Sequence, residues 1–260
     1  MARRLAAAVA LAGVIVLASG CGSGDEEASA PAPAPTVPAS VPLPEPTCGP
    51  DARQLGAADA AYAATVVRTT AARRVPGGDP VARFQPINVN GVPTVLGVLA
   101  VRRDRSCAPA WYRVQLPVRP NGSVGWVRAA DVRLSRVTTR IVVDLSDRRV
   151  TLYRDGERVL STTAAIGKPG TPTPIGSYYV NQRLLAADPT GPFGPGAVGI
   201  SAFSPTLQHW TQGGPIAIHG TNAPYKLGLA VSYGCVRVAN SQLLRLFDEA
   251  DEGTPVVIRS

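Results

Sequence analysis

The chain has 260 residues, of which 45% are hydrophobic and 17% charged, and this composition allows packed domains and excludes disorder along the whole chain. Aromatic residues make up only 5%, so stacking on single-stranded nucleic acid is excluded as the main activity. The first 50 residues hold two arginines and four acids, and residues 51–260 hold 24 basic and 14 acidic side chains, a net charge of +10. Such a surface favours an anionic partner, namely nucleic acid, anionic lipid or an acidic wall polymer.

The N-terminus predicts export. Arg3 and Arg4 precede the uncharged run Leu5–Ala18, which is shorter than the ~20 residues of a membrane span, and small residues then lead to Cys21. This order resembles a bacterial lipoprotein signal, in which residues 1–20 are removed and Cys21 is lipidated. The resemblance implies a lipid anchor on the outer face of the cell membrane, with an ordinary cleaved signal as the alternative. Export makes nucleic acid a poor partner and a wall polymer a better one.

The part after the signal divides into a tether and a first module. Residues 21–47 are rich in proline, alanine and serine, which predicts an extended tether without a core. Residues 48–135 contain short apolar runs between glycine and proline turns, which predicts a small β-barrel or sandwich. Trp111–Val127 resembles the closing strands of a bacterial SH3-like wall module. Ala52–Arg73 is rich in alanine, but its threonine and valine residues favour strands over a helix.

Residues 137–260 predict a second domain, mainly β with one short helix. Apolar runs at 141–145 and 149–153 are expected to form paired strands. Near the end, Asn240 is expected to cap a helix that reaches Ala250. The apolar face of that helix is expected to contain Leu243, Leu244 and Phe247.

The four cysteines are expected to have different roles. Cys21 is assigned to lipid, while Cys48 and Cys107 are expected to form a disulfide in an oxidising compartment, with two unrelated thiols as the alternative. Cys235 is left without a partner. An unpaired thiol in an exported protein suggests either a chemical role or an inert buried position.

The neighbours of Cys235 favour a chemical role. An apolar run ends in His219-Gly220, and Cys235 follows 16 residues after His219 within the sequence Ser-Tyr-Gly-Cys-Val-Arg. A thiol is a good nucleophile only as the thiolate, and a histidine can take its proton and return it to a leaving amine. One expectation is a resting pair of thiolate and imidazolium. Gly234 is expected to let backbone N–H groups approach an acyl oxyanion.

This arrangement resembles the catalytic domain of L,D-transpeptidases of the YkuD type, enzymes that cross-link the bacterial cell wall. The family signature is His-Gly, a spacer of this length, then Ser-His-Gly-Cys, an apolar residue and Arg or Asn, and Tyr233 replaces the second His. Residues 166–176, IGKPGTPTPIG, are similar to a second family motif. The resemblance covers residues 137–260 and implies the family's β-sandwich fold.

The resemblance also implies the site and the reaction. Cys235 would be the nucleophile of a cysteine acyltransferase and His219 its general base and acid, and substrate-binding positions would be Gly220, Ser232, Tyr233, Gly234 and Arg237. The implied substrate is the peptidoglycan stem peptide, which forms a thioester with loss of D-Ala and is then joined to a neighbouring stem in a 3–3 cross-link. Carbapenem-type β-lactams would acylate the same thiol.

Two alternatives to transpeptidation stay open. Water as the acceptor would make the protein an L,D-carboxypeptidase, and Tyr233 would suit a non-catalytic wall-binding lipoprotein. No cofactor is expected, because the letters GxGxxG at Gly194–Gly199 lack the strand-to-helix context of a dinucleotide site and are expected to border the active site. Because His209 and His219 are the only histidines, a metal site is poorly supported.

Overall fold

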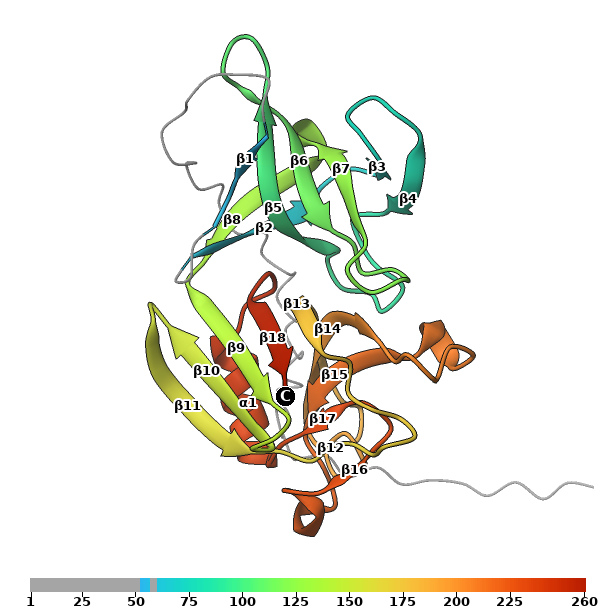
Figure 1. Cartoon of the computed structure of the whole chain (residues 1–260), viewed down its shortest axis with the longest axis vertical. Coiled ribbons are helices and arrows are strands. Elements are labelled where there is room, and N and C mark those ends of the chain that lie inside the picture. The colour runs from blue at the N-terminus through green and yellow to red at the C-terminus, as the bar shows by residue number, and fades with distance from the viewer. Residues whose placement is uncertain (1–51, 57–59) are drawn as a thin grey trace, which may run out of the picture. The chain divides into compact units, whose positions relative to one another are not determined.

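The computed structural model describes residues 52–56 and 60–260 (Figure 1). The predicted signal, the tether, Cys21 and Cys48 lie outside these residues. Within them the chain is mainly β, with one α-helix and three short 3-10 turns. None of the helices described is long and apolar enough to cross a membrane.

The first eight strands form one sheet in the order β4-β3-β7-β6-β5-β2-β8, with β1 paired to β5. They are β1 (Arg53–Gln54), β2 (Ala61–Val66), β3 (Thr70–Arg73), β4 (Pro80–Phe84), β5 (Val95–Arg103), β6 (Pro109–Gln115), β7 (Val124–Arg128) and β8 (Val132–Val137). The described part of the alanine-rich segment therefore forms strands and no helix, as its threonine and valine residues predicted. No pairing among these strands joins β4 to β8, and the SH3-like barrel stays a prediction.

The second sheet has the order β11-β10-β9-β18-β13-β14-β15-β17, and β12 pairs separately with β16. The strands are β9 (Thr139–Asp144), β10 (Arg149–Arg154), β11 (Glu157–Thr163), β12 (Ile166–Gly167), β13 (Gly176–Leu185), β14 (Gly196–Phe203), β15 (Pro215–His219), β16 (Ala230–Ser232), β17 (Val236–Arg237) and β18 (Pro255–Arg259). The β9–β10 pair is antiparallel and confirms the predicted hairpin. The β15–β17 pair is parallel, which brings the two halves of the sequence motif side by side.

Helix α1 (Asn240–Glu249) packs against β14 and β15. The helix is where it was predicted, but two details differ. Leu246 is fully buried with Leu243, whereas Leu244 is 45% exposed, because residues three and four apart share a helix face and adjacent residues do not. Asn240 is the first helical residue and not the cap; the N-cap is Ala239, which has no capping side chain.

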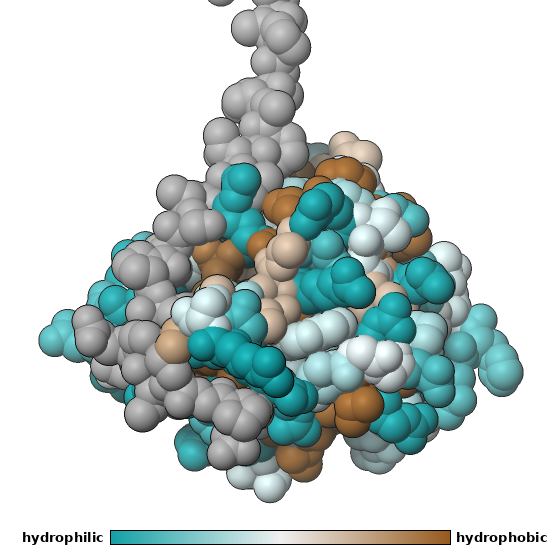
Figure 2. All heavy atoms as spheres, turned by 90° about the horizontal axis from the view of Figure 1, so that it is seen from above, coloured by the Kyte–Doolittle hydropathy of each residue, from teal (hydrophilic) through white to brown (hydrophobic). Residues whose placement is uncertain are grey.

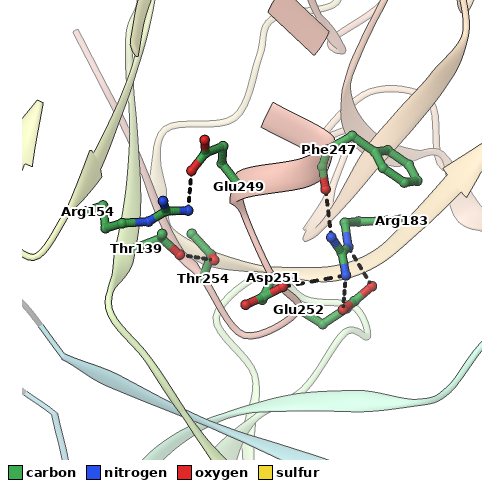
Figure 3. A network of polar contacts seen from close by, with 8 residues as sticks. All are labelled: Thr139, Arg154, Arg183, Phe247, Glu249, Asp251, Glu252 and Thr254. Atoms are coloured by element: carbon green, nitrogen blue, oxygen red, sulfur yellow. Dashed lines mark hydrogen bonds and ion pairs between the residues drawn. The ribbon is translucent and has the colours of Figure 1, made fainter. Parts of the chain in front are cut away.

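A network of polar contacts fixes the C-terminal end of α1 to the sheet (Figure 3). Arg183 of β13 donates to the Phe247 carbonyl at 2.6 Å and to Glu252 at 3.0 Å. Arg154 pairs with Glu249 on the other side of the helix end. Because Arg183 binds both a carbonyl of the last turn and the acid that follows the helix, the end of the helix keeps a fixed position on the second sheet.

The surface seen in Figure 2 is mixed, with hydrophilic residues around scattered hydrophobic ones. The most exposed large hydrophobic residues include Val89, which is 86% exposed, and Tyr225, which is 77% exposed. Single exposed apolar residues of this kind are common on protein surfaces and do not by themselves mark a binding face.

Candidate active site

The register of β15 and β17 brings His219 and Cys235 to the same face of the second sheet. Ile218 lies opposite Val236 and His219 opposite Arg237, so Cys235, one residue before β17, lies beside Ala217. Alternate residues of a strand share a face, and therefore Ala217, His219 and Cys235 point the same way. Ile218 and Val236 point the other way, into the core.

The His219 ring is buried and held in one tautomer. It is 3% exposed, the Phe193 ring lies 4.8 Å from it, and its Nδ1 lies 2.6 Å from the Gly220 carbonyl oxygen. A carbonyl can only accept a hydrogen bond, so Nδ1 carries the proton and donates. In the neutral ring Nε2 is then unprotonated and is free to act as a base.

Burial sets the charge state of the imidazole. It lowers the pKa of His219 to about 4; the charge of Arg237 lowers it too, while the Gly220 hydrogen bond raises it. Removing the ring from water penalises the imidazolium, which makes the neutral base the form present near pH 7.

The Cys235 sulfur lies along β15. Its Sγ is 4.0 Å from the Pro215 carbonyl oxygen, and its side chain is half-buried. Burial raises the pKa of the Cys235 thiol, although a backbone hydrogen bond from Ala217 and the charge of Arg237 lower it. Of the cysteines in the described ranges, Cys235 is the free one.

The expected resting pair of thiolate and imidazolium does not fit this geometry. The thiol is directed at Pro215, and within the described residues no hydrogen bond joins Cys235 to His219. The thiol pKa is raised and the imidazole pKa is lowered, so both groups rest uncharged. His219 must therefore accept the proton during the attack itself, and bonds between a nucleophile and its base often tighten only when substrate binds.

The buried imidazole predicts a pH-dependent stability. His219 has a pKa of about 4 when folded and about 6.5 when unfolded, so the unfolded chain binds more protons between these values and stability falls as the pH falls through them. We expect His219 to account for a loss of about 2.5 kcal/mol between pH 7 and pH 4.5. Urea unfolding gives the free energy of unfolding of the wild type and of His219→Asn at both pH values. The contributions of the other titrating groups cancel in the difference between the two proteins, so the change of that difference with pH measures the contribution of His219. If the difference in free energy of unfolding between the two proteins were the same at both pH values, the conclusion that the His219 ring is buried and neutral would be contradicted.

Ser232 and Gly234 shape the turn before the nucleophile. The fully buried Ser232 hydroxyl donates to the Cys235 carbonyl at 2.5 Å and accepts from the Gly234 N–H at 3.1 Å. Gly234 has φ +114°, and a Cβ there would lie 3.0 Å from Ile216 Cδ1, so glycine is required. Because the Gly234 N–H is bound to Ser232, an oxyanion hole at Cys235 must use other donors.

Position 220 must be a glycine because a side chain there would collide with Asn240, a contact that the sequence did not reveal. A Cβ at Gly220 would lie 2.4 Å from Asn240 Oδ1, and one at Gly194 would lie 2.3 Å from the same atom. That oxygen accepts a hydrogen bond from the Thr221 N–H at 2.7 Å. Asn240 therefore holds the turn after His219 and does not cap the helix, and Gly194 borders the site, as expected.

The second family motif packs under the turn of the nucleophile. Lys168 N–H and the Thr171 hydroxyl both donate to the Ser232 carbonyl, each at 3.0 Å. Thr173 Oγ1 accepts from the Gly167 N–H at 2.9 Å and closes the loop on itself. The 166–176 motif and the Ser-Tyr-Gly-Cys motif are therefore in direct contact.

Tyr233 is exposed beside the nucleophile and is part of a small cluster. Its side chain is 49% exposed, the Lys168 Nζ lies 4.6 Å from its ring centroid, and the Trp210 ring lies 5.5 Å away. Arg237 is half-buried opposite His219, and its Nε is buried without a hydrogen-bond partner. Neither Lys168 nor Trp210 was predicted as a site residue, because only the fold brings them to Tyr233.

The loop between β14 and β15, which carries Trp210, is held at both ends by the first sheet's β6–β7 connection. Arg119 donates to the Ser204 carbonyl at 2.7 Å and to the Gly213 carbonyl at 2.6 Å. Asn121 donates to the Phe203 carbonyl at 2.9 Å and accepts from the Phe203 N–H at 2.8 Å. Arg119 and Asn121 of this connection thus support an active-site loop.

Two further predictions concern cysteines and metals. Cys107 is disulfide-bonded, and since Cys48 lies outside the described residues, the pairing of these two stays a prediction. No group of three or more histidine, cysteine or acidic residues able to hold a metal ion occurs in the part of the chain described.

The domain that carries this site is similar to a known family of domains. Residues 138–258 match the L,D-transpeptidase catalytic domain, YkuD. Two curated relatives that carry the L,D-transpeptidase name are YkuD of Bacillus licheniformis, 37% identical over 119 residues (46% of this chain and 64% of the relative), and YbiS of Escherichia coli, 30% identical over 131 residues (45% and 43%). Among solved structures, the catalytic domain of the Enterococcus faecium L,D-transpeptidase is 26% identical to this chain, with a TM-score of 0.35. The match covers 46% of this chain and 96% of the E. faecium domain. Residues 138–258 are thus similar to L,D-transpeptidase catalytic domains, and the chain spans less than two thirds of the length of either curated relative.

Proposed function

We propose that this protein is a peptidoglycan L,D-transpeptidase that works through a thioester on Cys235 and forms 3–3 cross-links. The observation that carries the proposal is the β15–β17 register, which sets Cys235 and an unprotonated His219 Nε2 on one sheet face. The domain match of residues 138–258 supports the reaction class.

In the first half-reaction the Cys235 sulfur attacks the carbonyl carbon of the third stem residue, a diamino acid. His219 Nε2 accepts the thiol proton as the carbon–sulfur bond forms. The amide bond to the terminal D-Ala then breaks, the imidazolium returns the proton to the leaving amine, and D-Ala departs. The stem is left as a thioester, and both residues again carry no charge.

In the second half-reaction the side-chain amine of a neighbouring stem attacks the thioester carbon. His219 takes a proton from the attacking amine, the carbon–sulfur bond breaks, and the thiol is restored. Exclusion of water decides between the cross-link and simple hydrolysis. A carbapenem would enter by the first step, since attack on the strained lactam amide opens the ring and leaves an acyl group on Cys235.

Chromatography of muropeptides tests the proposal. After incubation with disaccharide-tetrapeptide, we expect a 3–3 dimer and an equal amount of free D-Ala. Tripeptide without dimer would identify an L,D-carboxypeptidase. Binding to isolated wall with no release of D-Ala from any donor would support the non-catalytic alternative and contradict the proposal.

The cellular place of the reaction is also a proposal. Residues 1–20 as a lipoprotein signal, Cys21 as the lipidated residue and residues 21–47 as a tether would hold the enzyme at the outer face of the membrane, within reach of the wall. Loss of the membrane-bound fraction in Cys21→Ala, with the catalytic domain still folded, is the result that this arrangement predicts.

A further inference from the structure

The segment that builds the active site is almost free of acidic residues. Residues 158–247 contain one acid, Asp188, against six basic residues: Arg158, Lys168, Arg183, Lys226, Arg237 and Arg245. The Asp188 carboxylate accepts from the Thr190 N–H at 2.9 Å and from its hydroxyl at 2.6 Å. The positive charge of this segment is therefore not neutralised from within.

Two of these cations stay unpaired beside the nucleophile. Arg183 has acidic partners in Glu252 and Asp251, but no ion pair in the described part of the chain involves Lys168 or Arg237. Lys168 is exposed, and its backbone is bound to Ser232, three residues before Cys235. An exposed ammonium at a fixed position without a counter-ion is suited to an anionic group of a ligand.

The aromatic neighbours define where that group would bind. Tyr233 and Trp210 are 49% and 54% exposed, and their rings lie 5.5 Å apart. The Lys168 Nζ lies 4.6 Å from the Tyr233 ring centroid, a cation–π distance that restrains a long, otherwise flexible side chain. Two apolar ring surfaces beside a restrained cation fit an aliphatic peptide that ends in or carries a carboxylate.

We propose that Lys168, Tyr233 and Trp210, here called the Lys168 cluster, form a subsite for a carboxylate of the acyl-donor peptide. Lys168 pairs with the carboxylate, and the two rings form the wall against which the adjoining aliphatic part of the donor lies. This inference rests on the proposed function and names the chemical group that the enzyme recognises. The carboxylate belongs either to the terminal D-Ala or to the side chain of the diamino acid.

A cycle of enzyme variants and donors tests the subsite. The variants are wild type, Lys168→Gln, Lys168→Arg and the control Lys226→Gln, whose ammonium also lies over a tyrosine ring, 5.7 Å from Tyr225, in the same acid-poor segment. The donors are disaccharide-tetrapeptide, its C-terminal amide, and the form amidated on the diamino acid. The measured quantity is kcat/KM for D-Ala release, or for release of D-alaninamide from the terminal amide.

For the unmodified donor we expect Lys168→Gln to lower kcat/KM about 10-fold through KM, Lys168→Arg to retain most of it, and Lys226→Gln to retain all of it. For the donor that lacks the recognised carboxylate, Lys168→Gln should have no further effect, which identifies the carboxylate. An equal loss for all three donors, or no loss, would overturn the subsite.

A binding measurement separates this inference from the proposed function. In the Cys235→Ala background, calorimetry with the unmodified donor should give a Kd about 10-fold weaker when Lys168→Gln is added. Donor binding that depends on Lys168 without turnover in the wild type would contradict the proposed reaction and retain the subsite. Turnover in the wild type together with a donor Kd that Lys168→Gln does not change would support the proposed reaction and contradict the subsite.

Discussion

Replacement of Cys235 by alanine is expected to abolish D-Ala release, lowering kcat by a factor on the order of 10⁴ or more. The reason is that the thioester cannot form, and removal of a nucleophile in comparable acyl-transfer sites has effects of this size. The side chain is half-buried, so loss of one sulfur should lower the free energy of unfolding by only about 1 kcal/mol. Amino-acid analysis of released D-Ala gives the rate, and the intact mass with a carbapenem gives the adduct.

The Cys235→Ser variant is the matched control for shape. It replaces the sulfur with an oxygen nucleophile of similar size but far lower reactivity. The variant should therefore still bind the donor, while its turnover should be as poor as that of Cys235→Ala. A folded Cys235→Ala protein that still gains the carbapenem mass would show that another residue is acylated, and the site assignment would fail.

Replacement of His219 by asparagine is expected to lower kcat/KM by 10²- to 10⁴-fold at pH 7, the usual contribution of a general base. The asparagine amide can still donate to the Gly220 carbonyl, so the turn after residue 219 is preserved while the base at Nε2 is lost. Since burial raises the pKa of the Cys235 thiol, the variant should gain about tenfold in rate per pH unit through neutrality, as free thiolate becomes more abundant.

The wild type should behave differently over the same range. Its imidazole has a pKa of about 4, so the base is already neutral above that value and the acylation rate should be nearly constant from pH 6 to pH 8. Rates of carbapenem acylation, followed by stopped-flow absorbance, give both profiles. A His219→Asn variant with the wild-type rate and a flat profile would place the base elsewhere.

Much of the fold could be predicted because it depends on local patterns. Short apolar runs identified β9 and β10, and threonine and valine favoured strands over helix in β2 and β3. The His-Gly and Ser-x-Gly-Cys motifs lie at the ends of short strands, so their spacing in the sequence reflects a local register that sequence reasoning can recognise.

The remaining features depend on contacts between distant segments. Asn240 was expected to cap its own helix, but its oxygen is used by Thr221, 19 residues earlier. Lys168 and Trp210 come to Tyr233 only through the packing of two loops. The uncharged resting state of Cys235 and His219 follows from burial, which no motif contains.

The most direct test of the central claim is the mass of the peptide that contains Cys235 after the enzyme is mixed with disaccharide-tetrapeptide and quenched in acid within one turnover. We predict that this peptide gains the mass of the donor less D-Ala, that the label is released by hydroxylamine as expected of a thioester, and that His219→Asn gains it far more slowly. An unmodified Cys235 peptide in a reaction that is releasing D-Ala would contradict the account.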